Sequence, residues 1–86
     1  ETFLYYFNKN IEIDFCVPSA QLAIQVSYNL NDEATYEREV GALIKFLKAF
    51  PGYHGYIITR DYETQIEADG HTIEVVPIWK WLLQSR

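Results

Sequence analysis

Two consecutive segments of alternating apolar and polar residues constrain the fold of this chain most strongly. Residues 11–17 and residues 22–28 each place an apolar side chain at every second position. A period of two predicts strands that turn one face toward a core. Residues 2–7 are aromatic and β-branched and predict a strand before them, and residues 8–10 are turn formers that would close a hairpin. In the first alternating segment the pattern assigns one face to Ile11, Ile13, Phe15 and Val17.

A long amphipathic helix is predicted after these strands, over about residues 34–50. Asp32 or Asn31 is a suitable N-cap, and the pair Pro51-Gly52 stops the helix. Helical spacing predicts that the buried face consists of Tyr36, Val40, Leu43, Ile44 and Leu47.

The remaining segments complete a mixed α/β domain. Residues 55–59 are nearly all apolar and predict an interior strand, because such a strand is covered on both faces. Residues 64–68 and 71–76, joined by Asp69-Gly70, predict a second hairpin, and residues 78–83 a short terminal helix. The expected order is β-β-β-α-β-β-β-α, with about five to six strands in one mixed sheet. The two strands joined through the long helix run parallel.

Composition limits the function classes. A chain of 86 residues makes a single domain, 1–86, and 49% hydrophobic residues are typical of a globular one. The net charge of −5 disfavours nucleic-acid binding by this chain alone. A lone cysteine favours a reducing, cytoplasmic compartment, and no apolar run is long enough to span a membrane. Because the chain starts at Glu1 and enters a strand at once, we expect a piece of a larger protein.

Asp14, Gln25 and Ser27 are the candidate site residues. Metal-dependent nucleases place an acid at the end of one hairpin strand, and then an acid or Gln, an apolar residue and a Lys on the next. The acids hold Mg²⁺, and the Lys stabilises charge on the attacked phosphate. Asp14 and the run Gln25-Val26-Ser27 fit the layout, with Glu12 on the same face as Asp14, but Ser27 occupies the Lys position. A hydroxyl supplies neither a full positive charge nor a strong base.

Simpler interpretations stand beside this one. Asp14 and Gln25 also suit a solvated or helix-covered sheet face, and Ser27 has no neighbouring His in any motif that would activate it. Cys16 with His54 or His71 is a weak catalytic pair, since a buried structural cysteine is the usual case. None of the four glycines belongs to a phosphate-binding loop.

Several short motifs, in this order and spacing, resemble a domain found C-terminal to AAA+ ATPase modules in archaeal and bacterial proteins. The resemblance covers nearly the whole chain and rests on residues 12–15, 24–27, Thr35, 37–39, 42–43, 57–59, 75–77 and 79–83. It implies a restriction-endonuclease-like core of the PD-(D/E)XK type. Within that motif Asp14 matches the Asp and Gln25 matches the Glu or Gln, whereas Ser27 departs from the Lys.

The resemblance implies a non-catalytic accessory or interaction domain at the C-terminal end of an AAA+-type ATPase. Its partner would be the ATPase module, which would bind ATP outside this chain. Aromatic residues make up 16% of the chain, which leaves room for self-association through exposed rings. One alternative is a metal-dependent nuclease acting on DNA, with Mg²⁺ at Asp14. Another is a free-standing protein-interaction module.

Overall fold

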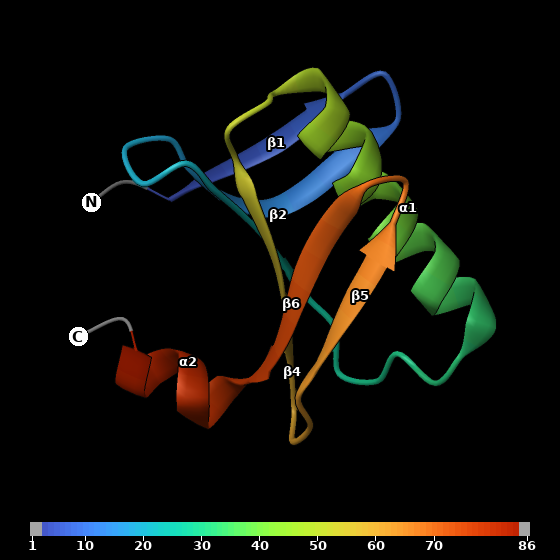
Figure 1. Cartoon of the computed structure of the whole chain (residues 1–86), viewed down its shortest axis with the longest axis vertical. Helices are drawn as coiled ribbons and strands as arrows, with labels where there is room; N and C mark the ends of the chain where they lie inside the picture. The colour runs from blue at the N-terminus through green and yellow to red at the C-terminus, as the bar shows by residue number, and fades with distance from the viewer. Residues whose placement is uncertain (1–2, 85–86) are drawn as a thin grey trace.

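A computed structural model describes residues 3–84 of the chain. It contains six strands and two helices in the expected order (Figure 1). Their bounds are β1 Leu4–Asn8, β2 Ile11–Val17, β3 Leu22–Val26, α1 Glu33–Ala49, β4 His54–Thr59, β5 Thr64–Ala68, β6 His71–Pro77 and α2 Ile78–Gln84.

All six strands form one mixed sheet in the order β1-β2-β3-β4-β6-β5. The pairs β1/β2, β2/β3 and β5/β6 are antiparallel, whereas β3/β4 and β4/β6 are parallel. The parallel pair β3/β4 is joined through α1, as the sequence predicts. The mixed α/β class and the six-stranded sheet are therefore confirmed.

Two tight turns set the register of the two hairpins. Lys9 and Asn10 have φ values of 49° and 66°, and Asp69 and Gly70 have φ values of 53° and 79°. Two consecutive residues with positive φ form a type I′ turn, which matches the twist of antiparallel strands. Each turn is closed by a directly opposed pair, Asn8 with Ile11 in the first hairpin.

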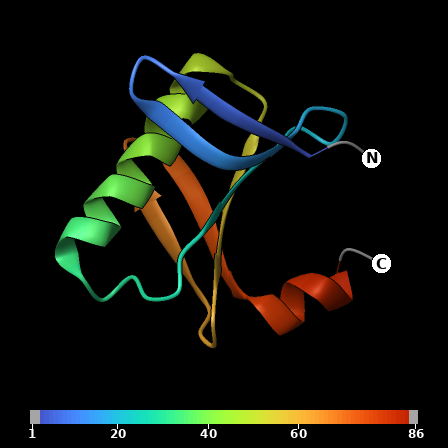
Figure 2. The same cartoon turned by 180° about the vertical axis from the view of Figure 1, so that it is seen from behind.

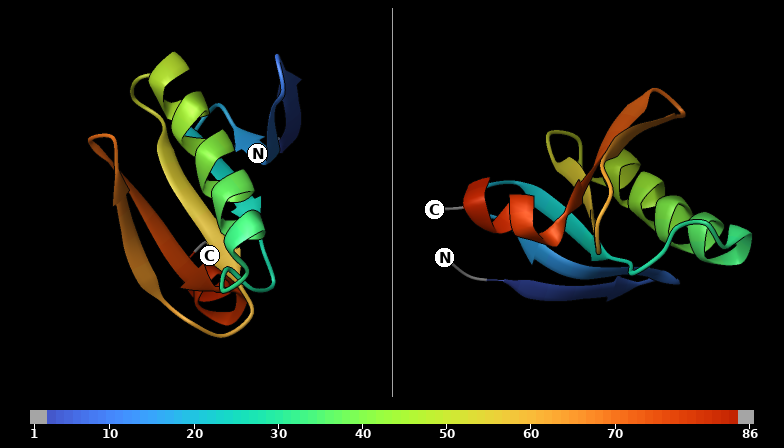
Figure 3. Two further views of the ribbon diagram at one scale, coloured as in Figure 1. Left: turned by 90° about the vertical axis from the view of Figure 1, so that its right-hand side faces the viewer. Right: turned by 90° about the horizontal axis from the view of Figure 1, so that it is seen from below.

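The helix α1 packs on one face of the sheet, and the twist of the sheet places β1–β2 and β5–β6 on either side of it (Figures 2 and 3). Asp32 is the N-cap: its carboxylate accepts hydrogen bonds from Thr35 N at 2.9 Å and Thr35 Oγ1 at 2.8 Å. These bonds hold the pKa of Asp32 below its usual value. On β4, a Cβ added at Gly55 would lie 3.0 Å from Leu47 Cδ1, so the glycine permits the close approach of α1.

The predicted helix face needs one correction. Val40, Leu43, Ile44 and Leu47 are buried as expected, but Tyr36 in the first turn is 38% exposed. Phe46, which is not among the five residues predicted for the buried face, is 2% exposed. It packs against Tyr6 of β1 and Tyr53, with ring centroids 4.9 Å and 5.2 Å apart. Because the sheet curls around the C-terminal part of α1, a wider face is covered there than a flat sheet would cover.

The strict alternation predicted for residues 11–17 is wrong. Ile13 and Cys16 both belong to the core cluster under α1, although three positions separate them. Val17 belongs to a second cluster on the other face, with Ile24, Ile58 and Val76. Ile13 opposes Tyr6 and Cys16 opposes Leu4, so Asp14 and Phe15 together face the single residue Tyr5. An extra residue in one strand is a β-bulge, and it shifts the faces of everything beyond it.

Candidate functional site

The structure brings Glu12, Asp14 and Gln25 together where β2 and β3 separate. The ladder between these strands runs from Val17/Leu22 to Phe15/Ile24. Beyond it, Glu12, Asp14 and Gln25 border a pocket of about 220 Å³ together with Arg38 and Glu39 of α1. Sequence reasoning therefore predicted the proximity of Asp14 and Gln25 correctly.

Hydrogen bonds to the backbone occupy the side-chain amide of Gln25. Its Oε1 accepts from Asp14 N at 2.9 Å, and its Nε2 donates to Glu12 O at 2.9 Å. The carboxylate of Asp14 accepts from Val26 N at 2.8 Å. Two side chains thus continue the connection between β2 and β3 after the backbone ladder ends. Gln25 is only 2% exposed, whereas Asp14 is half-buried and Glu12 is exposed, so this arrangement lies at the border of the core.

Ser27 does not join the other two candidates. It lies one residue beyond β3, where its backbone N–H donates to Ile58 O at 2.9 Å. It is 6% exposed and borders a different pocket from Asp14 and Gln25. The three positions of the nuclease-like motif are therefore divided between two places in the fold.

Glu39 of α1 also borders the pocket of Asp14 and Gln25, although it is not among the candidate residues named from the sequence. Its side chain is only 16% exposed, and its carboxylate accepts from Arg38 Nε at 3.3 Å. Burial, followed by the nearby charge of Asp14, raises the pKa of Glu39 above its usual value. Glu12 instead accepts a hydrogen bond from the Tyr5 phenol at 2.6 Å, which is the main cause of a raised pKa for Tyr5. Within residues 3–84, no group of three or more His, Cys, Asp or Glu side chains is placed to hold a metal ion.

Cys16 and the histidines lie in different parts of the sheet. Cys16 is buried under α1, and burial raises the pKa of its thiol, which favours the unreactive neutral form. His54 starts β4 and borders a pocket on the opposite face. His71 starts β6, which β3 and β4 separate from β2. The arrangement does not form a Cys–His pair.

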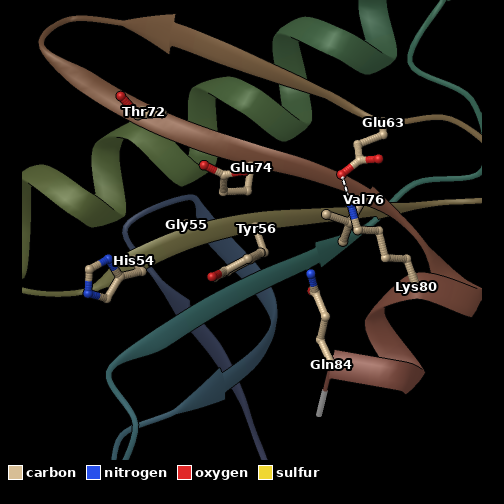
Figure 4. A pocket seen from close by; sticks show the side chains of 9 residues that line it. All are labelled: His54, Gly55, Tyr56, Glu63, Thr72, Glu74, Val76, Lys80 and Gln84. Carbon is tan, nitrogen blue, oxygen red and sulfur yellow. Dashed lines mark hydrogen bonds and ion pairs between the residues drawn. The ribbon is translucent and has the colours of Figure 1, made fainter.

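The pocket that contains His54 is polar and has a volume of about 400 Å³ (Figure 4). Its charged side chains are held by neighbours: Lys80 of α2 forms an ion pair with Glu63, and Glu74 accepts from Gln65 Nε2 at 2.7 Å. Tyr56 packs edge-on against Trp81 at a centroid distance of 5.2 Å. The contacts of Lys80 and Trp81 attach α2 to the loop before β5 and to β4, and the Glu74 bond joins β6 to β5.

An apolar cavity of about 340 Å³ lies where β3 and β4 end and α2 begins. Val26, Tyr28, Ile58 and Ile78 border it, and the Arg60 guanidinium lies 5.2 Å from the centre of the Tyr28 ring. Exposed apolar side chains lie at its border and on the helix that follows it. Tyr28 is 71% exposed and Val26 50% exposed, and Trp79 and Leu83 on α2 are 58% and 61% exposed. We call Val26, Tyr28, Ile78, Trp79 and Leu83 the α2 surface.

Comparison with known proteins finds one similar curated sequence but no family. An uncharacterised protein of Methanocaldococcus jannaschii, MJ1544, is 37% identical over 90 residues, which cover 96% of this chain. The chain spans about a fifth of the length of that relative, since the match covers 20% of it. No family model matches the chain, and no solved structure matches it. Neither helix in the described part of the chain is long and apolar enough to cross a membrane.

Proposed function

We propose that this chain is a non-catalytic accessory domain of a larger, cytoplasmic AAA+-type ATPase, and that it docks on the ATPase module through the α2 surface. The observation that carries the proposal is the exposure of apolar side chains on α2 and beside it. Trp79 and Leu83 lie one helical turn apart on the same side of α2, and Ile78 at the start of α2 borders the apolar cavity. Contiguous exposed apolar side chains mark interaction sites.

Two further observations support this proposal. The relative in Methanocaldococcus jannaschii is about five times longer than the matched region, so there a similar segment is one part of a long chain. The sequence motifs resemble domains that follow AAA+ modules, so the neighbouring part of the longer chain would be such a module. ATP would then be bound by the neighbouring module. Tethering within one chain gives a docking surface a high effective concentration, so a modest patch is sufficient.

Catalysis by this chain is the weaker alternative. The nuclease reading needs Asp14 and Gln25 as ligands for Mg²⁺, but Gln25 is occupied by Asp14 N and Glu12 O. The position of the motif's Lys is held by Ser27, which borders a different pocket. A nuclease-related fold that has lost its catalytic set agrees with both facts.

Binding to the module encoded upstream of this segment tests the proposal. The module is immobilised, and the chain is titrated against it by surface plasmon resonance. We expect saturable binding that Trp79→Glu and Leu83→Glu weaken at least tenfold. Ala34→Glu is the matched control, since it adds the same charge at an exposed position of α1. If the upstream segment lacks an ATPase module or the chain does not bind it, the accessory-domain proposal is wrong.

A further inference from the structure

The two edges of the sheet differ in how they are protected against pairing. β5 forms one edge. It carries Glu67 within the strand, and Glu63 lies directly before its first residue. β1 forms the other edge, with the sequence LYYFN and no charged residue. Figure 3 shows β1 as the outermost strand, with no helix against its outer edge. Natural edge strands are normally protected by charges, prolines, bulges or a covering element, and within residues 3–84 β1 has only the bulge of β2 opposite Tyr5.

The turn between β1 and β2 determines which backbone groups of β1 point to the open edge. In the type I′ turn, the carbonyl of Asn8 faces the N–H of Ile11, so Asn8 and Ile11 form a hydrogen-bonded pair. Phe7 and Glu12, the next pair, are then a non-hydrogen-bonded pair. The N–H and C=O of Phe7 therefore point away from β2. Tyr5 lies two residues earlier in the same strand, opposite the bulge of β2, and alternation along β1 gives its N–H and C=O the same direction.

This arrangement is self-complementary. Suppose that a second copy of β1 pairs antiparallel with the first, with the two Tyr6 residues opposite each other. Phe7 of each chain then lies opposite Tyr5 of the other chain, which gives two such pairs. Both residues direct their backbone groups to the edge, so the two pairs would exchange four hydrogen bonds. Tyr5 and Phe7 are each 61% exposed, and their side chains would form two aromatic cross-strand pairs.

Charge also favours a second copy as the occupant. The chain carries a net charge of −5, so most of its surfaces would repel an identical surface. β1 contributes no carboxylate to such a contact. The backbone of Glu12, on β2, would lie about three strand spacings, or about 14 Å, from the backbone of its equivalent. The carboxylate of Glu12 reaches toward β1, where it accepts a hydrogen bond from the Tyr5 phenol at 2.6 Å, so this spacing separates the two backbones and not the two charges.

We propose that two copies of this chain associate through antiparallel pairing of β1 with β1, centred on Tyr6, to form a continuous twelve-stranded sheet. This contact lies on a different element from the α2 surface and involves a different partner, so it goes beyond the accessory role. Association stops at the dimer because β1 is consumed and the charged β5 edge remains.

Sedimentation equilibrium over a range of concentrations tests the association. We expect a monomer–dimer equilibrium that Phe7→Pro shifts to monomer by at least tenfold in dissociation constant. Proline at this position removes an N–H that points to the open edge and spares the ladder to β2. Gln65→Pro is the control and should leave the equilibrium unchanged, because the turn at Asp69-Gly70 makes Gln65 a non-hydrogen-bonded position whose N–H points to the open edge of β5. Circular dichroism establishes that each variant is folded, and Phe7→Lys replaces Phe7→Pro if the proline variant is not.

Cysteine cross-linking tests the register. We expect a mixture of Tyr5→Cys and Phe7→Cys chains to form a disulfide-linked dimer under mild oxidation, several-fold faster than either variant alone. The unsubstituted chain, whose Cys16 is buried, measures the background. A chain that stays monomeric at millimolar concentration overturns the proposal. So does a dimer that Phe7→Pro and Phe7→Lys leave intact, or one that cross-links equally in all samples. Pairing of β1 with an extended segment of another protein, without self-association, also overturns it.

Discussion

The side-chain amide of Gln25 bonds the backbone of two residues on the neighbouring strand, accepting from Asp14 N and donating to Glu12 O, each at 2.9 Å. It thereby satisfies one donor and one acceptor that the end of the β2/β3 ladder leaves without backbone partners. In turn, the carboxylate of Asp14 accepts a hydrogen bond from Val26 N. The residues that a nuclease motif would assign to a metal are thus used to hold two strands together.

Replacing Gln25 with Met should destabilise the fold. Methionine has a similar shape but removes the hydrogen bonds to Asp14 N–H and Glu12 C=O, and each such hydrogen bond contributes about 0.5–1.5 kcal/mol. Urea unfolding followed by circular dichroism measures the loss. Gln65→Met on the exposed edge strand β5 is the control and should change the free energy of unfolding by less than about 0.5 kcal/mol. Equal losses for both variants would show that the Gln25 bonds contribute little.

Leu43→Ala should cost about 2–5 kcal/mol of unfolding free energy, because Leu43 is 0% exposed and the substitution leaves a cavity between α1 and the sheet. The matched variant Leu83→Ala removes the same atoms from a side chain that is 61% exposed, and should cost less than about 0.5 kcal/mol. Chemical denaturation of both variants gives the comparison. A loss below about 1 kcal/mol for Leu43→Ala would place this residue outside the core.

Stability should fall as the pH rises through the range in which Glu39 ionises. The pKa of Glu39 is raised in the folded state, so between its unfolded value and its folded value the folded chain holds more protons than the unfolded one. Under that condition, unfolding free energy decreases with increasing pH. Glu39→Gln should therefore stabilise the chain at neutral pH and flatten this part of the profile.

The control for this prediction is Glu37→Gln at an exposed position of the same helix, which should leave the profile nearly unchanged. Thermal unfolding between about pH 4 and pH 8 provides the measurement. A profile that is identical for the chain and for Glu39→Gln would contradict the assigned burial cost.

The chain alone should not cleave DNA in the presence of Mg²⁺ or Mn²⁺. Gln25 is held by the backbone, and the position of the motif's Lys carries Ser27. Incubation with supercoiled plasmid and with single-stranded DNA, followed by gel electrophoresis, provides the measurement. Metal-dependent cleavage that Asp14→Ala abolishes, and that Asp61→Ala in an exposed loop retains, would restore the nuclease alternative.

Much of the fold follows from sequence pattern alone. The helix α1, the two hairpins and the interior strand β4 were predicted within one or two residues, because each depends on local periodicity and turn chemistry. Helical spacing also predicts that Trp79 and Trp81, two positions apart on α2, point to different sides of the helix. Trp79 is 58% exposed, whereas Trp81 packs on Tyr56.

Only the tertiary structure decided the bulge at Asp14–Phe15, the division of Ser27 from Asp14 and Gln25, and the burial of Phe46 and Glu39. Each depends on how strands curve and where they part, and these are non-local properties that a period of two or of 3.6 does not contain. The sequence by itself determined that Asp14 and Gln25 would be neighbours, because the short connection between residues 17 and 22 fixes which positions of the two strands meet. The gap between β2 and β3 determined the hydrogen-bond partners of Gln25. Backbone groups in that gap have no ladder partner, so a side chain that reaches them must satisfy them.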